Sequence, residues 1–246
     1  MDRMLYVAMS GAKETLKAQA ANNHNLANAS TTGFRADLAA FQSQSVKGAG
    51  YGTRAYATNS SVGFDFTSGA MQSTGRDLDV AIQGSGYFAV QGRDGREAYT
   101  RAGDLRVDPQ GQLLTATGLQ VMGDAGPISV PPNGSLLIGT DGTISIVPQG
   151  QGPDTRSVVG RIKLVDPPSG QLVRSDAGLF RLKDGTDAPA SASVHLGSGM
   201  LESSNVNLAD TMVNMIELAR RYDLQVKAMR SAEDNGAASA QLLKNG

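Results

Sequence analysis

Apolar residues near both ends of this chain recur at alternating spacings of three and four residues. An α-helix places residues with this spacing on one side, so the pattern predicts one long helix at each end. Neither apolar face is stable in water, and we expect each helix to pack against the other and against neighbouring molecules. The positions are Leu5, Met9, Ala12, Leu16, Gln19, Asn23 and Leu26 in the first segment, and Leu208, Met212, Met215, Ala219, Tyr222, Val226, Met229, Gly236, Ala240 and Leu243 in the last.

Capping and turn residues mark the ends of both predicted helices. The first helix is expected from about residue 2 to residue 28, and the residues that follow it, 29–33, favour a helix stop closed by glycine. The last helix begins at Asn207, whose side chain is suited to cap the first turn while Asp210 bonds back to it. It extends to about Leu243.

Between the helices, from about residue 72 to residue 200, the chain has the pattern of short β-strands. Residues 78–82 alternate between apolar and polar side chains, and a second apolar run, 87–90, follows a glycine-containing turn. An antiparallel β domain is expected, because several turns contain pairs that favour tight hairpins. These pairs are Asp94-Gly95, Asn133-Gly134, Asp141-Gly142 and Asp184-Gly185.

Together these elements predict an α+β fold. Long antiparallel N- and C-terminal helices form a coiled-coil-like inner domain, and the central domain is mainly antiparallel β structure. The inner domain is discontinuous and comprises residues 1–35 and 201–246, whereas the β-rich outer domain comprises residues 72–200. Residues 36–71 are interpreted as an extended linker, because they combine several glycines with a Ser/Thr/Asn-rich stretch.

Composition excludes several classes of function. Hydrophobic residues make up 40% of the 246 residues, which is enough for a globular core. A formal net charge of −1, with no long run of Lys or Arg, argues against a nucleic-acid partner. Cysteine is absent, which removes disulfides and thiolate chemistry. No window reaches the ~18 apolar residues of a membrane span, and the first residues lack the apolar run of a cleaved signal peptide.

Candidate catalytic residues are few. The two histidines, His24 and His195, are interpreted as surface or packing residues. Ser10 and Lys13 have the S-x-x-K spacing of Ser/Lys hydrolases, but the K-T-G and S-D-N elements that accompany it are missing. A nucleophilic site at Ser10 is therefore a weak interpretation.

Carboxylate pairs and glycine-rich loops give no stronger signal. Asp77 and Asp79 alternate along one predicted strand and are interpreted as facing solvent rather than as a metal or catalytic pair. Gly84 and Gly86 precede a strand instead of joining a strand to a helix, so a dinucleotide site is not predicted. We predict no catalytic residues, no cofactor and no metal site.

Three parts of the chain carry a recognisable combination of residues. They are residues 9–12 and 25–35 near the start, residues 75–88 and 99–103 in the middle, and residues 201–207, 212–217 and 220–222 near the end. Their sequences, which include NLANASTTGFR, GRDLDVAIQGSGYF and LESSNVN, resemble the bacterial flagellar rod and hook protein family. Within that family, the first residues and the modest length are most similar to the proximal rod subunits.

The resemblance implies a non-enzymatic subunit of the basal-body rod, the periplasmic shaft that transmits motor torque to the hook. The implied partners are copies of the chain itself, other proximal and distal rod subunits, and the flagellar type III export apparatus. Family members leave the cytoplasm through that apparatus without a cleaved signal peptide. A distal rod subunit is the second interpretation, although the longer linker of that branch is not obvious in this sequence.

The helix pattern itself predicts how such subunits would assemble. Apolar faces wider than one partner can cover leave apolar surface after the two helices have paired, and contacts with different neighbours that do not close generate a helical tube. We therefore expect an assembly interface that comprises Leu5, Met9, Ala12, Leu16, Leu26, Asn28, Gly33, Phe34, Met212, Met215, Ile216, Tyr222, Val226 and Met229.

Two other functions remain open at this point. The chain could be a periplasmic or surface binding module whose helices form a small closed oligomer, or a hydrolase that uses Ser10 and Lys13. We also predict that both terminal segments are largely disordered in the isolated monomer. Half-covered helix faces bury too little apolar surface to offset the ordering of roughly 60 residues at ~1–2 kcal/mol each.

Overall fold

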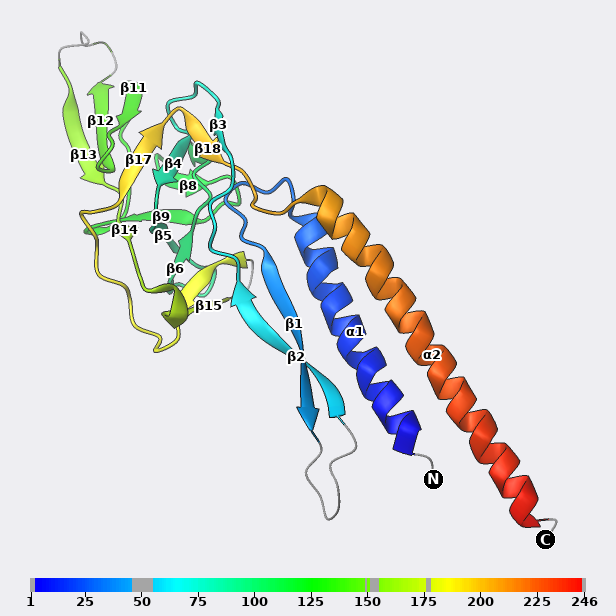
Figure 1. The fold of residues 1–246 in the computed structure, drawn as a ribbon. Helices are drawn as coiled ribbons and strands as arrows, with labels where there is room; N and C mark the ends of the chain where they lie inside the picture. The colour runs from blue at the N-terminus through cyan, green and yellow to red at the C-terminus, as the bar shows by residue number, and fades with distance from the viewer. Residues whose placement is uncertain (1–2, 46–54, 149, 151–154, 176–177, 245–246) are drawn as a thin grey trace. The chain divides into compact units, whose positions relative to one another are not determined.

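The structure is a computed structural model that describes residues 3–45, 55–148, 150, 155–175 and 178–244 (Figure 1). The chain divides into two compact units. The first, here called the helical unit, comprises Met1–Ala29, Ala36–Asp65 and Val206–Gly246, and the second, here called the β unit, comprises Ser30–Arg35 and Phe66–Asn205. The chain therefore passes between the units at residues 29–30, 35–36, 65–66 and 205–206.

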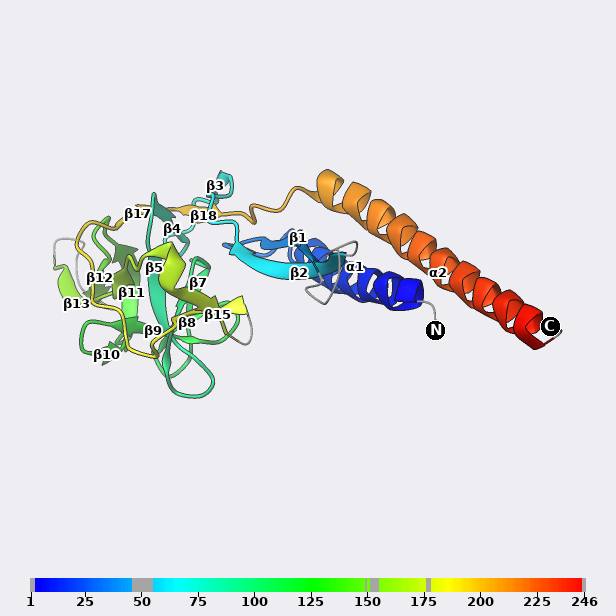
Figure 2. The ribbon, with the colours of Figure 1, turned by 60° about the horizontal axis from the view of Figure 1, so that its bottom comes forward.

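Two long helices form most of the helical unit. Helix α1 (Arg3–Ala27) and helix α2 (Leu208–Lys244) run antiparallel and pack against each other (Figures 1 and 2). The predicted cap by the Asn207 side chain is confirmed, because Oδ1 of Asn207 accepts the amides of Ala209 and Asp210 at 3.0 and 3.4 Å.

Small and polar side chains form the buried contact between the helices. At Gly11, an added Cβ would lie 2.9 Å from Cδ of Gln225 in α2, so the two helices are close here and a larger residue would displace the end of the Gln225 side chain. Asn22 is buried and its Nδ2 donates to the carbonyl oxygen of Thr211 at 2.9 Å. The other buried positions of this contact include Ala8, Ala12, Thr15 and Ala18 of α1, and Leu218 and Ala232 of α2.

The predicted coiled-coil-like inner domain is wrong, although both long terminal helices and the central antiparallel region are present. A coiled coil places large apolar side chains in its seam, whereas Leu5, Met9 and Leu16 are all exposed here. The predicted stripe has the correct helical spacing, but its large residues in α1 lie one residue, about 100°, away from buried positions such as Ala8 and Thr15. Small residues allow the closer backbone approach, and they set the phase of the contact instead of the large apolar residues.

Helix α1 also packs against a β-hairpin, which lies in the segment interpreted above as an extended linker. Strands β1 (Asp37–Ser45) and β2 (Ala55–Phe64) pair antiparallel, and both contact α1 (Figures 1 and 2). Asn25 joins the two elements, because its Nδ2 donates to the carbonyl oxygen of Asp37 at 2.9 Å and its Oδ1 accepts the Asp37 amide at 2.7 Å. His24 adds a contact of 2.6 Å between its Nδ1 and Oδ2 of Asp37.

The β unit consists of antiparallel strands in several sheets. The largest has the order β15 (Leu172–Arg174), β16 (Phe180–Leu182), β6 (Glu97–Thr100), β5 (Tyr87–Gln91), β9 (Gln120–Gly123), β8 (Leu113–Thr115), β7 (Leu105–Val107), with β10 (Gly126–Pro127) on β9 and β14 (Leu164–Val165) on β5. A second has the order β11 (Asn133–Ile138), β12 (Thr143–Pro148), β13 (Ser157–Arg161). Two further pairs are β17 (His195–Ser198) with β4 (Val80–Gln83), and β18 (Met200–Glu202) with β3 (Met71–Ser73); η1 (Ser169–Gln171) is a short 3-10 helix.

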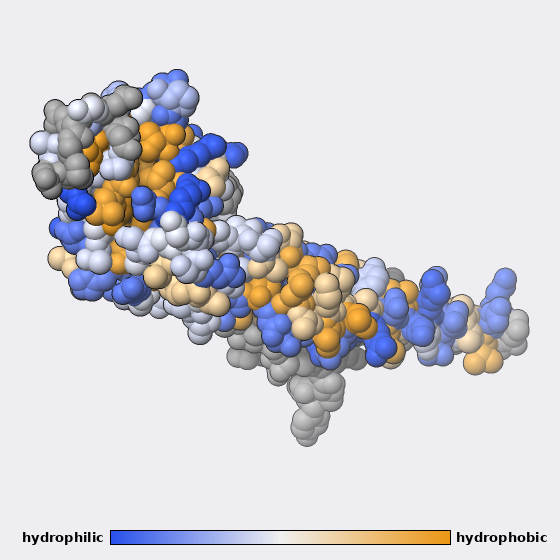
Figure 3. All heavy atoms as spheres, turned by 90° about the horizontal axis from the view of Figure 1, so that it is seen from above, coloured by the Kyte–Doolittle hydropathy of each residue, from blue (hydrophilic) through white to orange (hydrophobic). Residues whose placement is uncertain are grey.

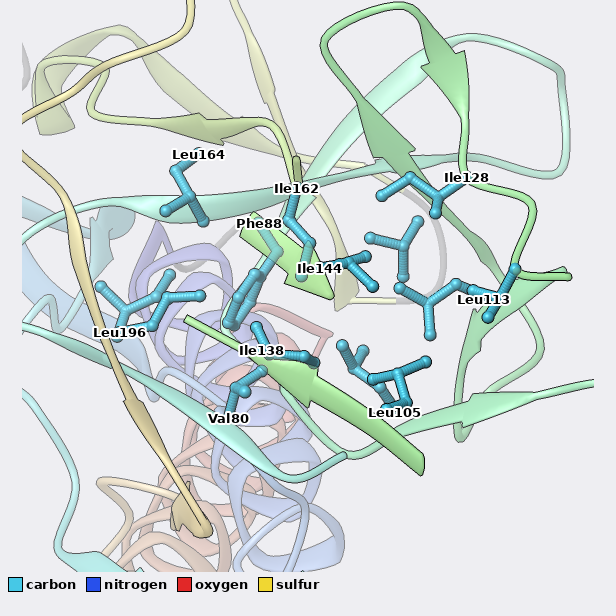
Figure 4. Packing of buried hydrophobic residues seen from close by; sticks show 14 of the residues in the cluster. Val80, Phe88, Leu105, Leu113, Ile128, Ile138, Ile144, Ile162, Leu164 and Leu196 are labelled. Carbon is cyan, nitrogen blue, oxygen red and sulfur yellow. The ribbon is translucent and has the colours of Figure 1, made fainter. Parts of the chain in front are cut away.

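Large apolar side chains from several of these strands form the core of the β unit (Figure 4). In β12, Ile144 and Ile146 point inward and are buried, whereas the alternate residue Ser145 is only partly buried, as the pleat of a strand requires. Phe88, Ile138 and Ile144 lie close together in this core (Figure 4). Each fully buried side chain of this size contributes roughly 1.5–3 kcal/mol, so the β unit contains its own source of stability.

Candidate functional site

The exposed apolar surface of the two helices is the first candidate site. Met9 of α1 and Met212 of α2 are 53% and 50% exposed although the helices are paired. Leu5 and Met9 of α1 occur four apart, as do Leu208, Met212 and Ile216 of α2, so they form short apolar rows beside the buried contact. Figure 3 shows hydrophobic side chains gathered on one face of this unit. The exposed members are Met4, Leu5, Tyr6, Met9 and Leu16 of α1, and Leu208, Met212, Val213, Ile216, Leu224 and Leu242 of α2.

The predicted interface residues fall into three groups. The exposed ones are Leu5, Met9, Leu16, Met212 and Ile216. Those of intermediate burial are Leu26, Asn28, Met215, Tyr222, Val226 and Met229. The buried ones are Ala12, which lies in the contact between the helices, and Gly33 and Phe34, which belong to the β unit. The exposed group can contact a neighbour directly, whereas the buried group could act only indirectly.

A buried cluster of charged side chains in the β unit is the second candidate site. Glu202, at the end of β18, forms ion pairs with two arginines: Oε1 lies 2.8 Å from Nη2 of Arg35, and Oε2 lies 3.0 Å from Nη1 of Arg101. The side chains of Arg35, Arg101 and Glu202 are 1%, 4% and 0% exposed. We call these three residues the Glu202 cluster.

Backbone groups of three chain segments meet around the Glu202 cluster. The amide of Gly33 donates to the carbonyl oxygen of Glu202 at 2.8 Å, and the amide of Gly69 donates to Oε1 of Glu202 at 3.0 Å. The amide of Asn205 donates to the carbonyl oxygen of Phe34 at 3.3 Å. Gly33 has a φ of +66° and its position has no room for a Cβ, which would lie 2.3 Å from the backbone of Arg101.

Aromatic rings border the Glu202 cluster. The guanidinium of Arg174 lies 4.8 Å from the centre of the Phe34 ring and 5.4 Å from that of Phe180, and its Nη2 donates to the carbonyl oxygen of Arg35 at 2.6 Å. Tyr87 packs against Phe180 with ring centres 5.7 Å apart. The ring of Phe34 thus lies against a cation.

Burial determines the electrostatics of the Glu202 cluster. Burial lowers the pKa of Arg101, and the charge of Glu202 opposes that shift. Burial likewise raises the pKa of Tyr87. Removal of one partner from such a buried pair is strongly destabilising, because it leaves an uncompensated buried charge. Each of the three charges therefore contributes to holding the segments of the cluster together.

The residues considered for catalysis remain dispersed. Ser10 and Lys13 lie in α1, His24 contacts Asp37, and His195 is exposed in β17. In the part of the chain that the structure describes, no three potential metal-binding side chains are grouped together. None of its helices has the length and apolar character that crossing a bilayer requires.

The interpretation of Asp79 as solvent-facing is wrong, whereas Asp77 is exposed. Asp79 is only 4% exposed, because its backbone forms a bridge with Asp104 and Nη1 of Arg76 lies 3.4 Å from its Oδ1. Burial and the charge of Asp79 raise the pKa of Asp104. The period-two pattern could not predict this burial, since it came from a neighbouring segment rather than from the strand itself.

Sequence reasoning did not single out the Glu202 cluster. Its three charged residues lie in the three segments quoted for the family resemblance: Arg35 follows Gly33-Phe34, Arg101 precedes Ala102-Gly103, and Glu202 precedes Ser203-Ser204. The available signal was that each of the otherwise uncharged segments 25–35, 99–103 and 201–207 contains one charged residue, an arginine in the first two and a glutamate in the third.

Family models match three parts of the chain. Residues 5–35 match the model described as flagella basal body rod protein, residues 81–146 the flagellar hook protein FlgE/F/G D1 domain, and residues 198–242 the flagellar basal body rod FlgEFG protein C-terminal. The Glu202 cluster takes Arg35 from the first of these parts and Glu202 from the last.

Curated relatives match the chain along almost its whole length. It is 45% identical to the flagellar basal-body rod protein FlgF of Escherichia coli K12 and 44% identical to that of Salmonella typhimurium, with 99% of each chain covered in both comparisons. It is 34% identical to the flagellar basal-body rod protein FlgG of Bacillus subtilis, over 95% of this chain and 96% of the relative.

Proposed function

The chain belongs to the flagellar basal-body rod protein family, and from this membership we propose that it is a structural, non-enzymatic subunit of the rod in the bacterial flagellar basal body. The observation that carries the proposal is the full-length match to relatives named FlgF, at 45% identity over 99% of both chains. The match to the FlgG relative is weaker, at 34%. A position in the proximal rod is therefore favoured over the distal rod.

We further propose that the chain assembles with copies of itself and with other rod subunits into a helical tube. The exposed apolar rows on α1 and α2 support this, because apolar surface that remains after the helices pair is stabilised by burial against neighbours. Contacts between different faces of successive subunits are heterologous, and such contacts extend into a tube when they do not close.

In this proposal, torque is transmitted through many small apolar contacts along the helices. Each contact between partly exposed side chains such as Met9, Met212 and Ile216 would add about 1 kcal/mol or less. Because many such contacts occur along a helix of 37 residues, together they make the wall of the tube rigid. The subunit would reach its place in the periplasm through the flagellar type III export apparatus, without a cleaved signal peptide.

The predicted interface is tested by a charge placed in the exposed apolar row. Ile216 is 55% exposed, so Ile216→Asp should change the free energy of unfolding of the monomer by no more than about 0.5 kcal/mol. Incorporation into basal bodies should be lost, because an aspartate would be buried unpaired against a neighbour. Swimming in soft agar and immunoblots of purified basal bodies measure the effect.

Asn214→Asp is the matched control, because Asn214 is exposed on the opposite side of α2 and the charge change is the same. Cells that carry Asn214→Asp should swim normally. Normal incorporation of Ile216→Asp would contradict the proposed interface. A small closed oligomer of the unmodified chain, measured by native mass, would instead support the binding-module interpretation.

A further inference from the structure

The segments that connect the β unit to the helical unit all converge on one side chain. The chain enters the β unit after α1 at residue 30 and leaves it after residue 35. It enters again after β2 at residue 66 and leaves toward α2 after residue 205. Within the β unit, Glu202 contacts the first two of these segments directly and belongs to the third. Every passage of the chain between the units therefore lies within a few residues, along the sequence, of Glu202 itself or of a residue that contacts it.

Both carboxylate oxygens of Glu202 take part in this convergence. Oε1 binds Arg35 of the first segment and the amide of Gly69 of the second, at 2.8 and 3.0 Å. Oε2 binds Arg101, whose Nη2 donates to the carbonyl oxygen of Gly84 at 2.6 Å. One carboxylate thus ties two connecting segments to the strands of the β unit.

Hydrogen bonds among the connecting segments reinforce the arrangement. The amide of Ser203 donates to the carbonyl oxygen of Ala70 at 2.9 Å, and Nδ2 of Asn205 donates to the carbonyl oxygen of Thr67 at 3.0 Å. The same Thr67 oxygen accepts a hydrogen bond from Nη1 of Arg35. These bonds involve only residues of the β unit, so they do not require the helices to be formed.

The contact between the helices has a different character. Its buried positions are mostly small or polar, including Gly11, Thr15 and Asn22, and they bury little apolar surface. The stability of this contact is therefore low by comparison with the core around Phe88. Local opening follows such differences in burial, so the helices are expected to open more readily than the connecting segments.

We propose that Glu202 is a positioning residue for assembly: it keeps the chain just after the C-terminal end of α1 and just before the N-terminal end of α2 fixed on the β unit, even when the helices themselves are open. A subunit held in this way brings two helix ends together before any neighbour binds. The helices then have less conformational entropy to lose when they order in the tube. This inference extends the proposed function. The claim that Glu202 promotes assembly depends on that function, whereas the claim that Glu202 protects the connecting segments from hydrogen exchange does not.

Amide hydrogen exchange on the full-length chain, at a dilution at which it is monomeric, tests the claim about protection. In the unmodified chain, the amides of Gly33, Gly69, Ser203 and Asn205 should exchange at least about tenfold more slowly than those of residues 8–18 in α1. Equal exchange in the two sets would contradict the inference.

Glu202→Gln tests the role of the carboxylate. The amides of Gly33 and Asn205 should lose about tenfold or more of their protection, because two buried guanidinium groups would lack their counter-charge. Glu97→Gln is the matched control, since Glu97 also forms an ion pair in the β unit, partly buried and 2.8 Å from Nζ of Lys163. The hydrogen bonds and ion pairs of the Glu97 side chain in the described part of the chain involve no connecting segment. An equal loss of protection at Gly33 and Asn205 in both variants would overturn the inference.

Arg35→Gln is a second variant, to be used if Glu202→Gln does not fold. It leaves Glu202 paired with Arg101, so the β unit should keep its fold. Loss of protection confined to residues 30–35 and 66–70 supports the inference, and unchanged protection there refutes it. If Glu202 promotes assembly, Glu202→Gln should enter basal bodies at least about tenfold less than Glu97→Gln. If the unmodified chain never enters basal bodies while the exchange contrast holds, the proposed function fails and the role of Glu202 stands.

Discussion

The helical unit and the β unit bury different kinds of side chain. The β unit collects large apolar residues such as Phe88, Leu105 and Ile144 in its interior, where they are fully buried. The helical unit does the reverse, because small residues such as Ala8 and Ala18 fill its interior while Met212 and Ile216 remain outside. The β unit is thus stabilised by its own core, whereas the helical unit leaves many of its large apolar side chains exposed.

The largest expected effect comes from truncating an apolar side chain in each unit. Phe88→Ala should lower the free energy of unfolding of the β unit by about 3–5 kcal/mol, because it removes a ring from a close-packed core. Met212→Ala should change stability by less than about 0.5 kcal/mol, since Met212 is half exposed. Urea unfolding followed by circular dichroism measures both values. Similar losses in the two variants would contradict the difference in side-chain burial between the two units.

Gly33→Ala should have the next largest effect. It forces a side chain into a left-handed conformation and against the backbone of Arg101, at a cost of about 2–3 kcal/mol. Gly95→Ala is the control, because Gly95 has a φ of +79° but no atom lies within 4 Å of the added Cβ, so only about 1 kcal/mol is expected. Thermal unfolding distinguishes the two, and equal shifts would mean that the segment at Gly33 is not held tightly.

The smallest predicted effect concerns Asp104 and pH. Burial, with the charge of Asp79, raises the pKa of Asp104 above its usual value of 3.8, so the folded β unit favours the neutral acid. The stability that this preference provides is present below the unfolded value and is lost as the pH rises through the folded value.

Asp104→Asn should therefore raise the free energy of unfolding near neutral pH by about 0.5 kcal/mol, a value reduced for solvent screening, and should flatten its decline above pH ~4. Asp77→Asn, at an exposed position nearby, should leave the pH profile unchanged. Parallel unfolding curves at several pH values measure this, and an unchanged slope in Asp104→Asn would contradict the assignment.

The sequence predicted the elements of the fold better than it predicted their contacts. Alternating spacings located both helices, and the Asp-Gly turns indicated antiparallel strands, because these signals act over a few residues. The predicted turn at Asn133-Gly134 is wrong, since this pair begins strand β11. The phase of the helix pair could not be obtained in this way, since Leu5 and Ala8 both fit a helical period and only the partner helix selects between them. Segment 36–71 was interpreted as a linker because of its glycines and its Ser/Thr/Asn-rich stretch, although strands β1 and β2 pair with each other within it.

The Glu202 cluster was hidden for a related reason. Arg35, Arg101 and Glu202 lie far apart in the sequence, and no periodicity links residues that meet only after the β unit has folded. The resemblance to rod proteins marked the segments in which they occur, but the resemblance alone could not show that their charges are paired.

Solvent access to Ile216 before and after assembly tests the central claim most directly. The chain has no cysteine, so Ile216→Cys introduces a single thiol at an exposed position of α2. If the apolar helix faces are covered by neighbouring subunits, a maleimide should label this thiol rapidly in the dilute monomer and at least about tenfold more slowly in purified basal bodies, with full labelling after the basal bodies are denatured. Equally rapid labelling in the monomer and in intact basal bodies would contradict the claim.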